Sequence, residues 1–220
     1  LQAVAWQDRH GAQQRLYEAV TDYVRHGYNQ ALVAKQRHIG FLMILMQRLV
    51  TSSTAAIRTT LERRQTLLNE PQPQASLFDS TEMDEWAEMD GQSQVDIAVQ
   101  TSGWAQEKAE VDLLLTLARE TEAQGTDAKA EALLELIYKL QQEENDPTMK
   151  VLIFTEFVPT QAMLAGFLES RGFSVALLNG SMDLDTRAKA QQAFSSAVRI
   201  LVSTDAGGEG LNLQFCHVIV

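Results

Sequence analysis

From Lys150 onward, short apolar runs alternate with helical patterns, and this alternation constrains the fold more than any other feature of the chain. Helical spacing of apolar residues follows Pro159 and again follows Leu184. Apolar runs with the length of buried strands lie at 151–155, 175–178, 199–203 and 217–220. Strands that alternate with helices in this way predict an α/β fold, with a parallel sheet flanked by helices.

Polar or glycine residues follow three of these expected strands. Thr155 ends the first run, Asn179 and Gly180 follow the second, and Ser203 and Thr204 lie at the end of the third. The carboxyl ends of parallel strands share one edge of a sheet, and ligands of such sheets bind beyond that edge. The third run continues into a loop with three glycines in four positions, 207–210, which allows a close approach to a phosphate or ribose. The sequence therefore predicts a phosphate-binding edge.

The N-terminal part has a different pattern. Amphipathic spacing predicts helices at 13–29, 31–50 and 54–68, and prolines interrupt the pattern after residue 69. We expect an α-helical region at 1–70, an acidic and partly disordered linker at 71–102, and the α/β part at 103–220. Within the last part, Asp127 is placed to cap a helix.

Charge is distributed unevenly along the chain. The formal net charge is −11, but residues 1–70 contain nine basic and five acidic side chains, whereas residues 71–150 contain five and eighteen. The acidity thus belongs to the middle of the chain, and a phosphate backbone is not excluded as a partner. We interpret Arg58, Arg63 and Arg64 as a charged, solvated helix face rather than a phosphate-binding one.

Several classes of function are disfavoured. Cys216 is the one cysteine, so an internal disulfide is excluded, and with scattered histidines it does not form a zinc site. We expect Cys216, Phe154 and Phe157 to be core residues. The densest apolar run, 39–46, is far shorter than the roughly 20 residues of a membrane span, so no membrane partner is expected.

Three strings in the C-terminal half resemble helicase motifs IV, IVa and V, in that order. They are the segment 150–157 (KVLIFTEF), the segment 178–182 (LNGSM) with Arg187 after it, and the segment 200–214 (ILVSTDAGGEGLNLQ). The last string resembles the form found in Swi/Snf-type translocases of superfamily two, in their bacterial branch. The resemblance implies a RecA-like second motor lobe, truncated in this sequence, in a cytoplasmic bacterial protein.

The resemblance also implies ATP and Mg²⁺ as cofactors of a full-length motor, and duplex DNA as its sequence-independent partner. Such a motor needs a phosphate loop, and no G-x-x-x-x-G-K-[ST] string occurs here. The arginine finger of the family would follow residue 220. We therefore expect this chain to be a fragment that binds no cofactor alone and does not hydrolyse ATP, because an arginine finger is worth about 10³–10⁵ in rate.

By resemblance, a nucleotide would contact Gly208, Glu209, Gly210 and Asn212, although the two-glycine loop also suits a tight turn and Asn212 suits a local Asx turn. The expected contacts with a nucleic-acid backbone come from the residues that end the three strands and from Arg187, namely Thr155, Gly180, Ser181, Ser203, Thr204 and Arg187. For Ser203 a structural role is equally compatible with the sequence. For Arg187 we favour bracing of the loop over a phosphate contact.

Two other functions are compatible with these patterns. One is a strand-separating RNA or DNA helicase. The other is a non-catalytic module of the same fold that docks a protein such as RNA polymerase, since the acidic middle segment suits a basic partner.

Overall fold

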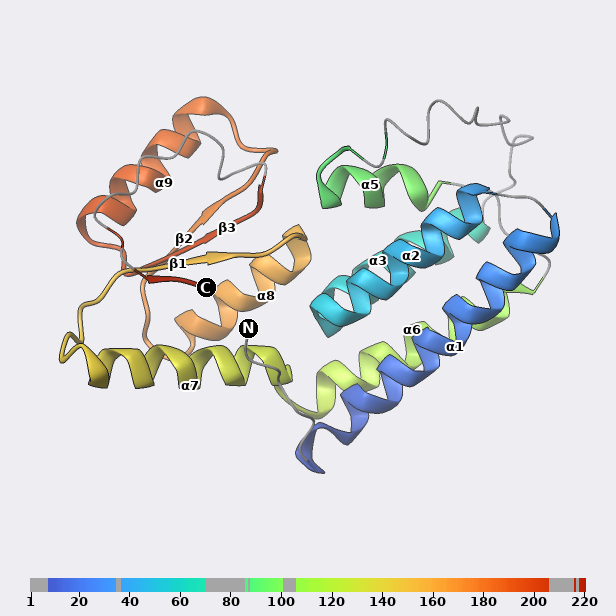
Figure 1. The fold of residues 1–220 in the computed structure, drawn as a ribbon, viewed down its shortest axis with the longest axis horizontal. Coiled ribbons are helices and arrows are strands. Elements are labelled where there is room, and N and C mark those ends of the chain that lie inside the picture. The colour runs from blue at the N-terminus through green and yellow to red at the C-terminus, as the bar shows by residue number, and fades with distance from the viewer. Residues whose placement is uncertain are drawn as a thin grey trace. The chain divides into compact units, whose positions relative to one another are not determined.

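The computed structural model describes residues 8–34, 37–69, 86, 88–100, 106–205, 216 and 218–220. The chain divides into two compact units (Figure 1). We call the described residues of Ala5–Asp127 the helical unit, and those of Ala128–Val220 the sheet unit. The domain boundaries that we predict at residues 70 and 102 remain predictions.

The helical unit begins with a short 3-10 helix at Asp8–His10 and contains five described α-helices. They are α1 (Gly11–Ala34), α2 (Arg37–Ser52), α3 (Thr54–Asn69), α5 (Gly91–Ala98) and α6 (Glu107–Gln124). Helix α1 packs against α2 and α6, and α3 packs against α2 and α6 (Figure 1). Helix α1 continues to Ala34, beyond the break expected near residue 30. Helix α5 lies within the segment that we expected to be a linker, and it packs against α2.

Helix α2 explains why this unit has a core. Its apolar residues recur every three or four positions, so one broad face is buried, including Ile39, Leu42, Met43, Met46 and Leu49. Burial of each such side chain contributes about 1.5–3 kcal/mol, which makes this face the main attachment of α2.

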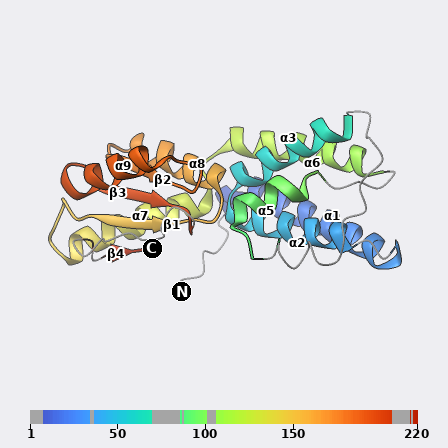
Figure 2. The same ribbon diagram turned by 90° about the horizontal axis from the view of Figure 1, so that it is seen from above.

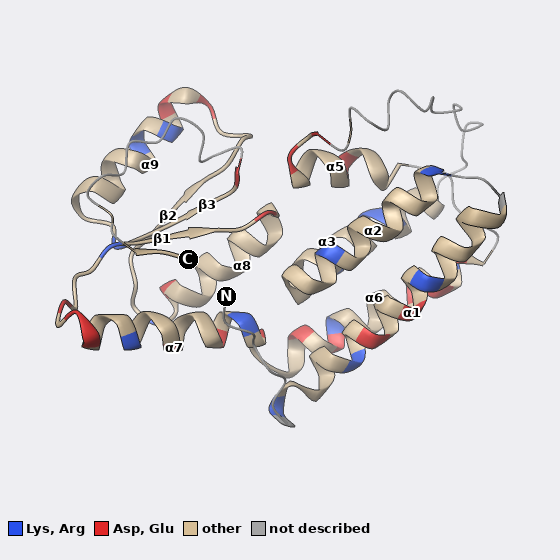
Figure 3. Cartoon of the chain, viewed as in Figure 1, with Lys and Arg blue, Asp and Glu red and all other residues tan. Residues whose placement is uncertain are grey.

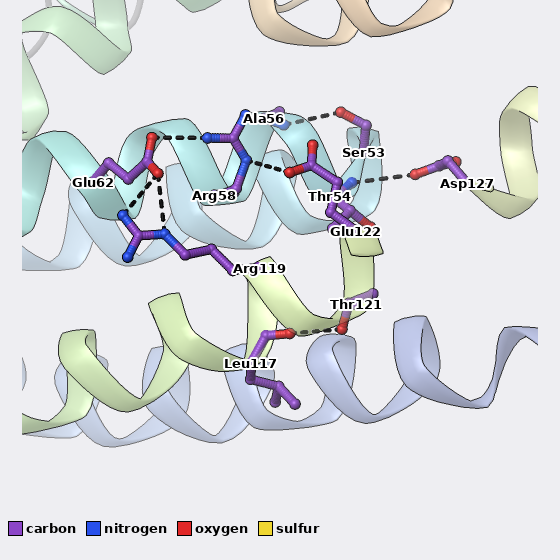
Figure 4. A network of polar contacts seen from close by, with 10 residues as sticks. All are labelled: Ser53, Thr54, Ala56, Arg58, Glu62, Leu117, Arg119, Thr121, Glu122 and Asp127. Atoms are coloured by element: carbon purple, nitrogen blue, oxygen red, sulfur yellow. Dashed lines mark hydrogen bonds and ion pairs between the residues drawn. The ribbon is translucent and has the colours of Figure 1, made fainter. Parts of the chain in front are cut away.

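The start of α3 is fixed by side-chain acceptors. Ser53 separates α2 from α3, and its Oγ accepts a hydrogen bond from the Ala56 N–H at 3.0 Å (Figure 4). The Thr54 N–H donates to Asp127 Oδ2 at 3.2 Å, and Gln13 Nε2 donates to the same oxygen at 2.8 Å. Helix N-termini have unpaired N–H groups, and these oxygens satisfy two of them. Asp127, which we expected to cap the following helix, therefore accepts a hydrogen bond from the first residue of α3.

One expectation about the arginines of α3 is wrong. Arg64 is only 1% exposed, and its guanidinium binds the fully buried Glu107 of α6 through Nε–Oε1 at 2.7 Å and Nη2–Oε2 at 2.8 Å. Arg64 Nη1 also donates to the Val99 carbonyl oxygen at 2.7 Å, and the Tyr23 hydroxyl donates to Glu107 Oε1 at 2.9 Å. Burial, and next the Glu107 carboxylate, raise the pKa of Tyr23 well above its usual value.

Arg58 fits the expected charged face better than Arg64 does. It is partly exposed and pairs with Glu62 at 2.8 Å and with Glu122 of α6 at 2.6 Å (Figure 4). Arg119 of α6 reaches the same Glu62 at 3.0 Å. These arginines therefore link α3 to α6 at the surface of the helical unit.

The sheet unit alternates helices and strands in the order α7 (Ala128–Glu143), β1 (Val151–Phe154), α8 (Val158–Glu169), β2 (Val175–Leu178), α9 (Leu184–Ser196), β3 (Ile200–Ser203) and β4 (Val218–Ile219). The strands form one parallel sheet in the order β2-β3-β1-β4 (Figures 1 and 2). This architecture confirms the predicted fold class.

Side chains of each strand alternate between two cores, as the pleat requires. Val151 and Ile153 pack with the apolar faces of α7 and α8, whereas Leu152 packs with Leu201 and with Phe194 of α9. Pro159 lies in the first turn of α8, as predicted. The chain leaves that helix through Gly172, whose φ of 84° lies in the left-handed region that glycine adopts at low cost.

The prediction that Phe154, Phe157 and Cys216 are core residues is confirmed only in part. Phe157 is fully buried, as predicted, but Phe154 is 39% exposed at the last position of β1. Cys216 is half-buried beside the second core, and its Sγ lies 3.5 Å from the Lys150 carbonyl oxygen.

Candidate functional site

The ends of three parallel strands lie in register at the carboxyl edge of the sheet. Phe154 of β1 and Leu178 of β2 both pair with Ser203 of β3. The residues that follow these strands therefore emerge side by side. This register brings to one edge five of the residues that we predict to contact nucleic acid: Thr155, Gly180, Ser181, Ser203 and Thr204.

Main-chain hydrogen bonds continue beyond the strands at this edge. The Thr155 N–H donates to the Ser203 carbonyl oxygen at 3.0 Å, and the Thr204 N–H donates to the Leu178 carbonyl oxygen at 2.9 Å. Both threonines are therefore held by backbone bonds, and their side chains do not need to support the loop. Among the described residues, neither threonine hydroxyl has a hydrogen-bond partner; Thr155 is half-buried and Thr204 is 5% exposed.

Ser203 differs from its neighbours at the edge. Its side chain is fully buried, and its hydroxyl donates to the Thr204 carbonyl oxygen at 2.9 Å. This geometry satisfies the structural alternative that the sequence left open for Ser203. Its expected contact with nucleic acid remains a prediction.

The loop after β2 is an Asx turn. Asn179 is buried, and its Oδ1 accepts from the Ser181 N–H at 3.2 Å and from the Ser181 hydroxyl at 2.7 Å. The Met182 N–H donates to the Asn179 carbonyl oxygen at 3.3 Å. Gly180 and Ser181 are exposed, so the turn presents its main chain to solvent.

Gln161 of α8 is a residue of this edge that the sequence reasoning missed. It is 1% exposed, and its Nε2 donates to the Leu178 carbonyl oxygen at 2.9 Å and to the Val202 carbonyl oxygen at 2.8 Å. Its Oε1 accepts from Asn179 Nδ2 at 3.0 Å. The sequence signal was weak: a single amide between the apolar positions of a helix that otherwise faces a core.

Arg187 lies in the first turns of α9, after the turn that contains Gly180. The helix begins at the N-cap Asp183, whose carboxylate accepts from the Thr186 N–H at 2.7 Å. This backbone hydrogen bond is the main cause that lowers the pKa of Asp183. Acidic and basic bands both lie on α9, which contains Asp185, Arg187 and Lys189 (Figure 3). The first turn of α9 is therefore a mixed-charge surface.

Gly208, Glu209, Gly210 and Asn212, the residues expected to contact a nucleotide, lie outside the described residues. In the described part of the chain, no group of three or more His, Cys, Asp or Glu residues could hold a metal ion. Within the same ranges, no helix is long and apolar enough to cross a membrane.

Residues 128–220 match a protein family described as the helicase conserved C-terminal domain. Over 94 residues the chain is 34% identical to the uncharacterized ATP-dependent helicase YqhH of Bacillus subtilis, a match that covers 43% of this chain and 16% of that protein. It is 36% identical over 91 residues to the ATP-dependent helicase rhp16 of Schizosaccharomyces pombe, covering 40% of this chain and 10% of that protein.

A further relative is the ATP-dependent RNA helicase DBP3 of Ajellomyces capsulatus, 34% identical over 93 residues, with 42% of this chain and 19% of that protein covered. The chain thus spans less than a fifth of these curated relatives. Among solved structures, the C-terminal part of the Fun30 ATPase domain matches 95% of this chain and 70% of its own, with a TM-score of 0.52 and 17% identity. This last likeness concerns the fold alone.

Proposed function

On the premise that residues 128–220 form a helicase conserved C-terminal domain, we propose that they are the second, RecA-like lobe of an ATP-dependent DNA translocase of the Swi/Snf type. The observation that carries the proposal is the common register of β1, β2 and β3, which places the motif residues after each strand at one edge. A duplex backbone is recognised through phosphate contacts, and such contacts carry no sequence information. The proposed partner is therefore duplex DNA of any sequence.

Within this proposal, the described residues have distinct roles. The hydroxyl groups of Thr204 and Thr155 and the exposed turn at Gly180 and Ser181 contact nucleic-acid phosphates, since small polar groups and open main chain meet there. Arg187 braces the start of α9. Gly208, Glu209, Gly210 and Asn212 are proposed to face ATP, whose hydrolysis by a full-length motor of this type would supply the work of translocation.

A strand-separating helicase that acts on RNA is the second candidate. The specific observation in its favour is the 34% identity to a protein named as an RNA helicase. Both candidates use the same sheet edge, so they differ in the nucleic acid that binds best. The string at 210–212, which reads Gly-Leu-Asn rather than Gly-Leu-Asp, favours the DNA translocase over the strand-separating helicase.

Binding of labelled nucleic acid to the 220-residue chain tests the proposal. Fluorescence anisotropy with a 20-base-pair DNA duplex, the matching RNA duplex and single strands ranks the partners, and we expect the DNA duplex to bind best. We expect Thr204→Val to weaken duplex binding about ten- to hundredfold, because one hydrogen bond to a charged group is lost. The salt dependence stays the same, since a neutral hydroxyl displaces no counterion.

Thr121→Val is the matched control. Thr121 is also a buried threonine, but its hydroxyl donates within α6 to the Leu117 carbonyl oxygen at 2.8 Å (Figure 4). Equal affinities of the Thr204→Val and Thr121→Val variants would contradict the proposed role of the sheet edge. Stronger binding of RNA than of DNA would favour the second candidate.

A further inference from the structure

Gln161 and Asn179 form a continuous path of hydrogen bonds from the buried strand ends to the exposed turn. Gln161 holds the carbonyl oxygens of Leu178 and Val202, which belong to neighbouring strands. Gln161 binds Asn179, and Asn179 binds both donors of Ser181. The helix α8, the strands β2 and β3 and the turn are therefore linked by side-chain amides at this edge.

The orientation of both amides is dictated by the backbone at the two ends of the path. Carbonyl oxygens only accept, so Gln161 must present its NH₂ group to Leu178 and Val202. Its oxygen then faces Asn179, which must in turn present its own NH₂ group. The Asn179 oxygen is thereby directed at the Ser181 N–H, which only donates. A single arrangement satisfies every member of the path.

The path decides which donor of the turn remains available. The N–H groups of Ser181 and Met182 and the Ser181 hydroxyl all donate within the turn. Gly180 is exposed, and its N–H has no hydrogen-bond partner among the residues that the structure describes. If Asn179 lost its fixed orientation, its NH₂ group could rotate toward the Ser181 N–H, and the turn would open.

We propose that Gln161 is a positioning residue for the phosphate contact at the sheet edge: by fixing the Asn179 amide, it holds the turn that offers the Gly180 N–H to a nucleic-acid phosphate. This inference rests on the proposed function, because the phosphate belongs to the DNA partner proposed above. Gln161 is buried, so it acts through Asn179 and does not touch the nucleic acid.

Gln161→Met tests the inference, because methionine has a similar volume but cannot bind the two carbonyl oxygens or Asn179. Amide hydrogen exchange of the ¹⁵N-labelled chain reports the turn without any ligand. We expect the Ser181 amide to exchange faster, and duplex affinity to fall about three- to tenfold, which is less than the loss of a whole phosphate contact because the Gly180 N–H is still present but no longer held in place.

Gln94→Met is the matched control. Gln94 is a buried glutamine of the helical unit whose Nε2 donates to the Met89 carbonyl oxygen at 2.9 Å and whose Oε1 accepts from Arg48 Nη1 at 2.5 Å. We expect this variant to lose stability as Gln161→Met does, with no change in Ser181 exchange or in duplex affinity. The control separates positioning from general destabilisation.

Gln161→Glu provides a second readout, and it decides the matter if Gln161→Met does not fold. A protonated carboxyl can accept from Asn179 and donate to one carbonyl oxygen, whereas an ionised one opposes both carbonyl oxygens. Burial raises the pKa of such a carboxyl. We therefore expect the affinity of Gln161→Glu, relative to the wild-type chain, to recover as the pH falls from 8 toward 5, while Gln161→Met shows no recovery.

Three results would overturn the inference. In the first, Gln161→Met leaves Ser181 exchange unchanged. In the second, exchange rises but duplex affinity does not fall although Thr204→Val weakens binding, so that the proposed function stands and the positioning role fails. In the third, neither Gln161→Met nor Thr204→Val changes the duplex affinity, and the proposed function fails together with the inference.

Discussion

Replacing Arg64 by methionine removes three hydrogen bonds from the buried centre of the helical unit, two to Glu107 and one to the Val99 carbonyl oxygen. The change leaves the Glu107 carboxylate buried, with the Tyr23 hydroxyl as its remaining donor among the described residues. Loss of one partner from a buried ion pair costs about 3–5 kcal/mol, because the other charge is left uncompensated. Domains have a free energy of unfolding of about 5–15 kcal/mol, so the helical unit would lose a large part of its stability.

Urea denaturation followed by tryptophan fluorescence isolates this unit. The chain has three tryptophans, Trp6, Trp86 and Trp104, and all lie in the part of the sequence that clusters as the helical unit. Circular dichroism follows both units together. We expect the fluorescence midpoint of Arg64→Met to fall while the m-value stays constant, which is the signature of lost stability without a change of denatured state.

Two further variants serve as comparisons for the stability of Arg64→Met. Arg64→Met/Glu107→Leu removes both charges, and we expect it to be about 2 kcal/mol more stable than Arg64→Met, because apolar replacement of a whole buried pair is often neutral. Arg25→Met breaks the exposed pair with Asp22, whose side chains are 69% and 73% exposed, and should cost about 0–1 kcal/mol. A cost of Arg64→Met no larger than that of Arg25→Met would refute the reasoning, as would strict additivity of the two buried changes.

Two further predictions concern charge. Because the pKa of Tyr23 is raised in the folded chain, its contribution to stability is complete below the tyrosine pKa of the unfolded chain, about 10, and is lost as the pH rises through the folded value. The stability advantage of the wild-type chain over Tyr23→Phe should shrink above pH 10 in urea titrations, and a constant difference would contradict this. For Arg187→Gln, bracing predicts an unchanged slope of log affinity for duplex DNA against log salt, whereas loss of a phosphate contact would reduce that slope by about 0.9.

Local sequence patterns were sufficient to predict the strands of the sheet unit. The runs at Val151–Phe154, Val175–Leu178 and Ile200–Ser203 are short, apolar and bounded by polar or glycine residues, and each became a parallel strand. Their spacing around amphipathic helices leaves few topologies, so the convergence of the strand ends was predictable before any contact was known. The expected roles of the site residues remain predictions, and those at 208–212 lie outside the described part of the chain.

Contacts between distant residues were not predictable in the same way. Arg64 and Glu107 are 43 positions apart, and Arg64 looked like a member of a solvated face until its helix packed against α6. Gln161 and Val202 are 41 positions apart, and nothing in the helix around Gln161 showed that its amide would meet two strand ends. Helix α5 was not predicted, because its sequence is polar; the Asp90 carboxylate caps its first turn, and the helix packs on α2.

The sequence by itself determined the kind of secondary structure, the parallel sheet and the edge where its polar loops meet, because periodicity and turn residues act over a few neighbouring positions. Only the tertiary structure decided which polar side chains are buried and what they bind. Burial of Arg64, Glu107 and Gln161 is tolerated because each meets a complementary group contributed by another element, and that complementarity exists only once the elements have packed.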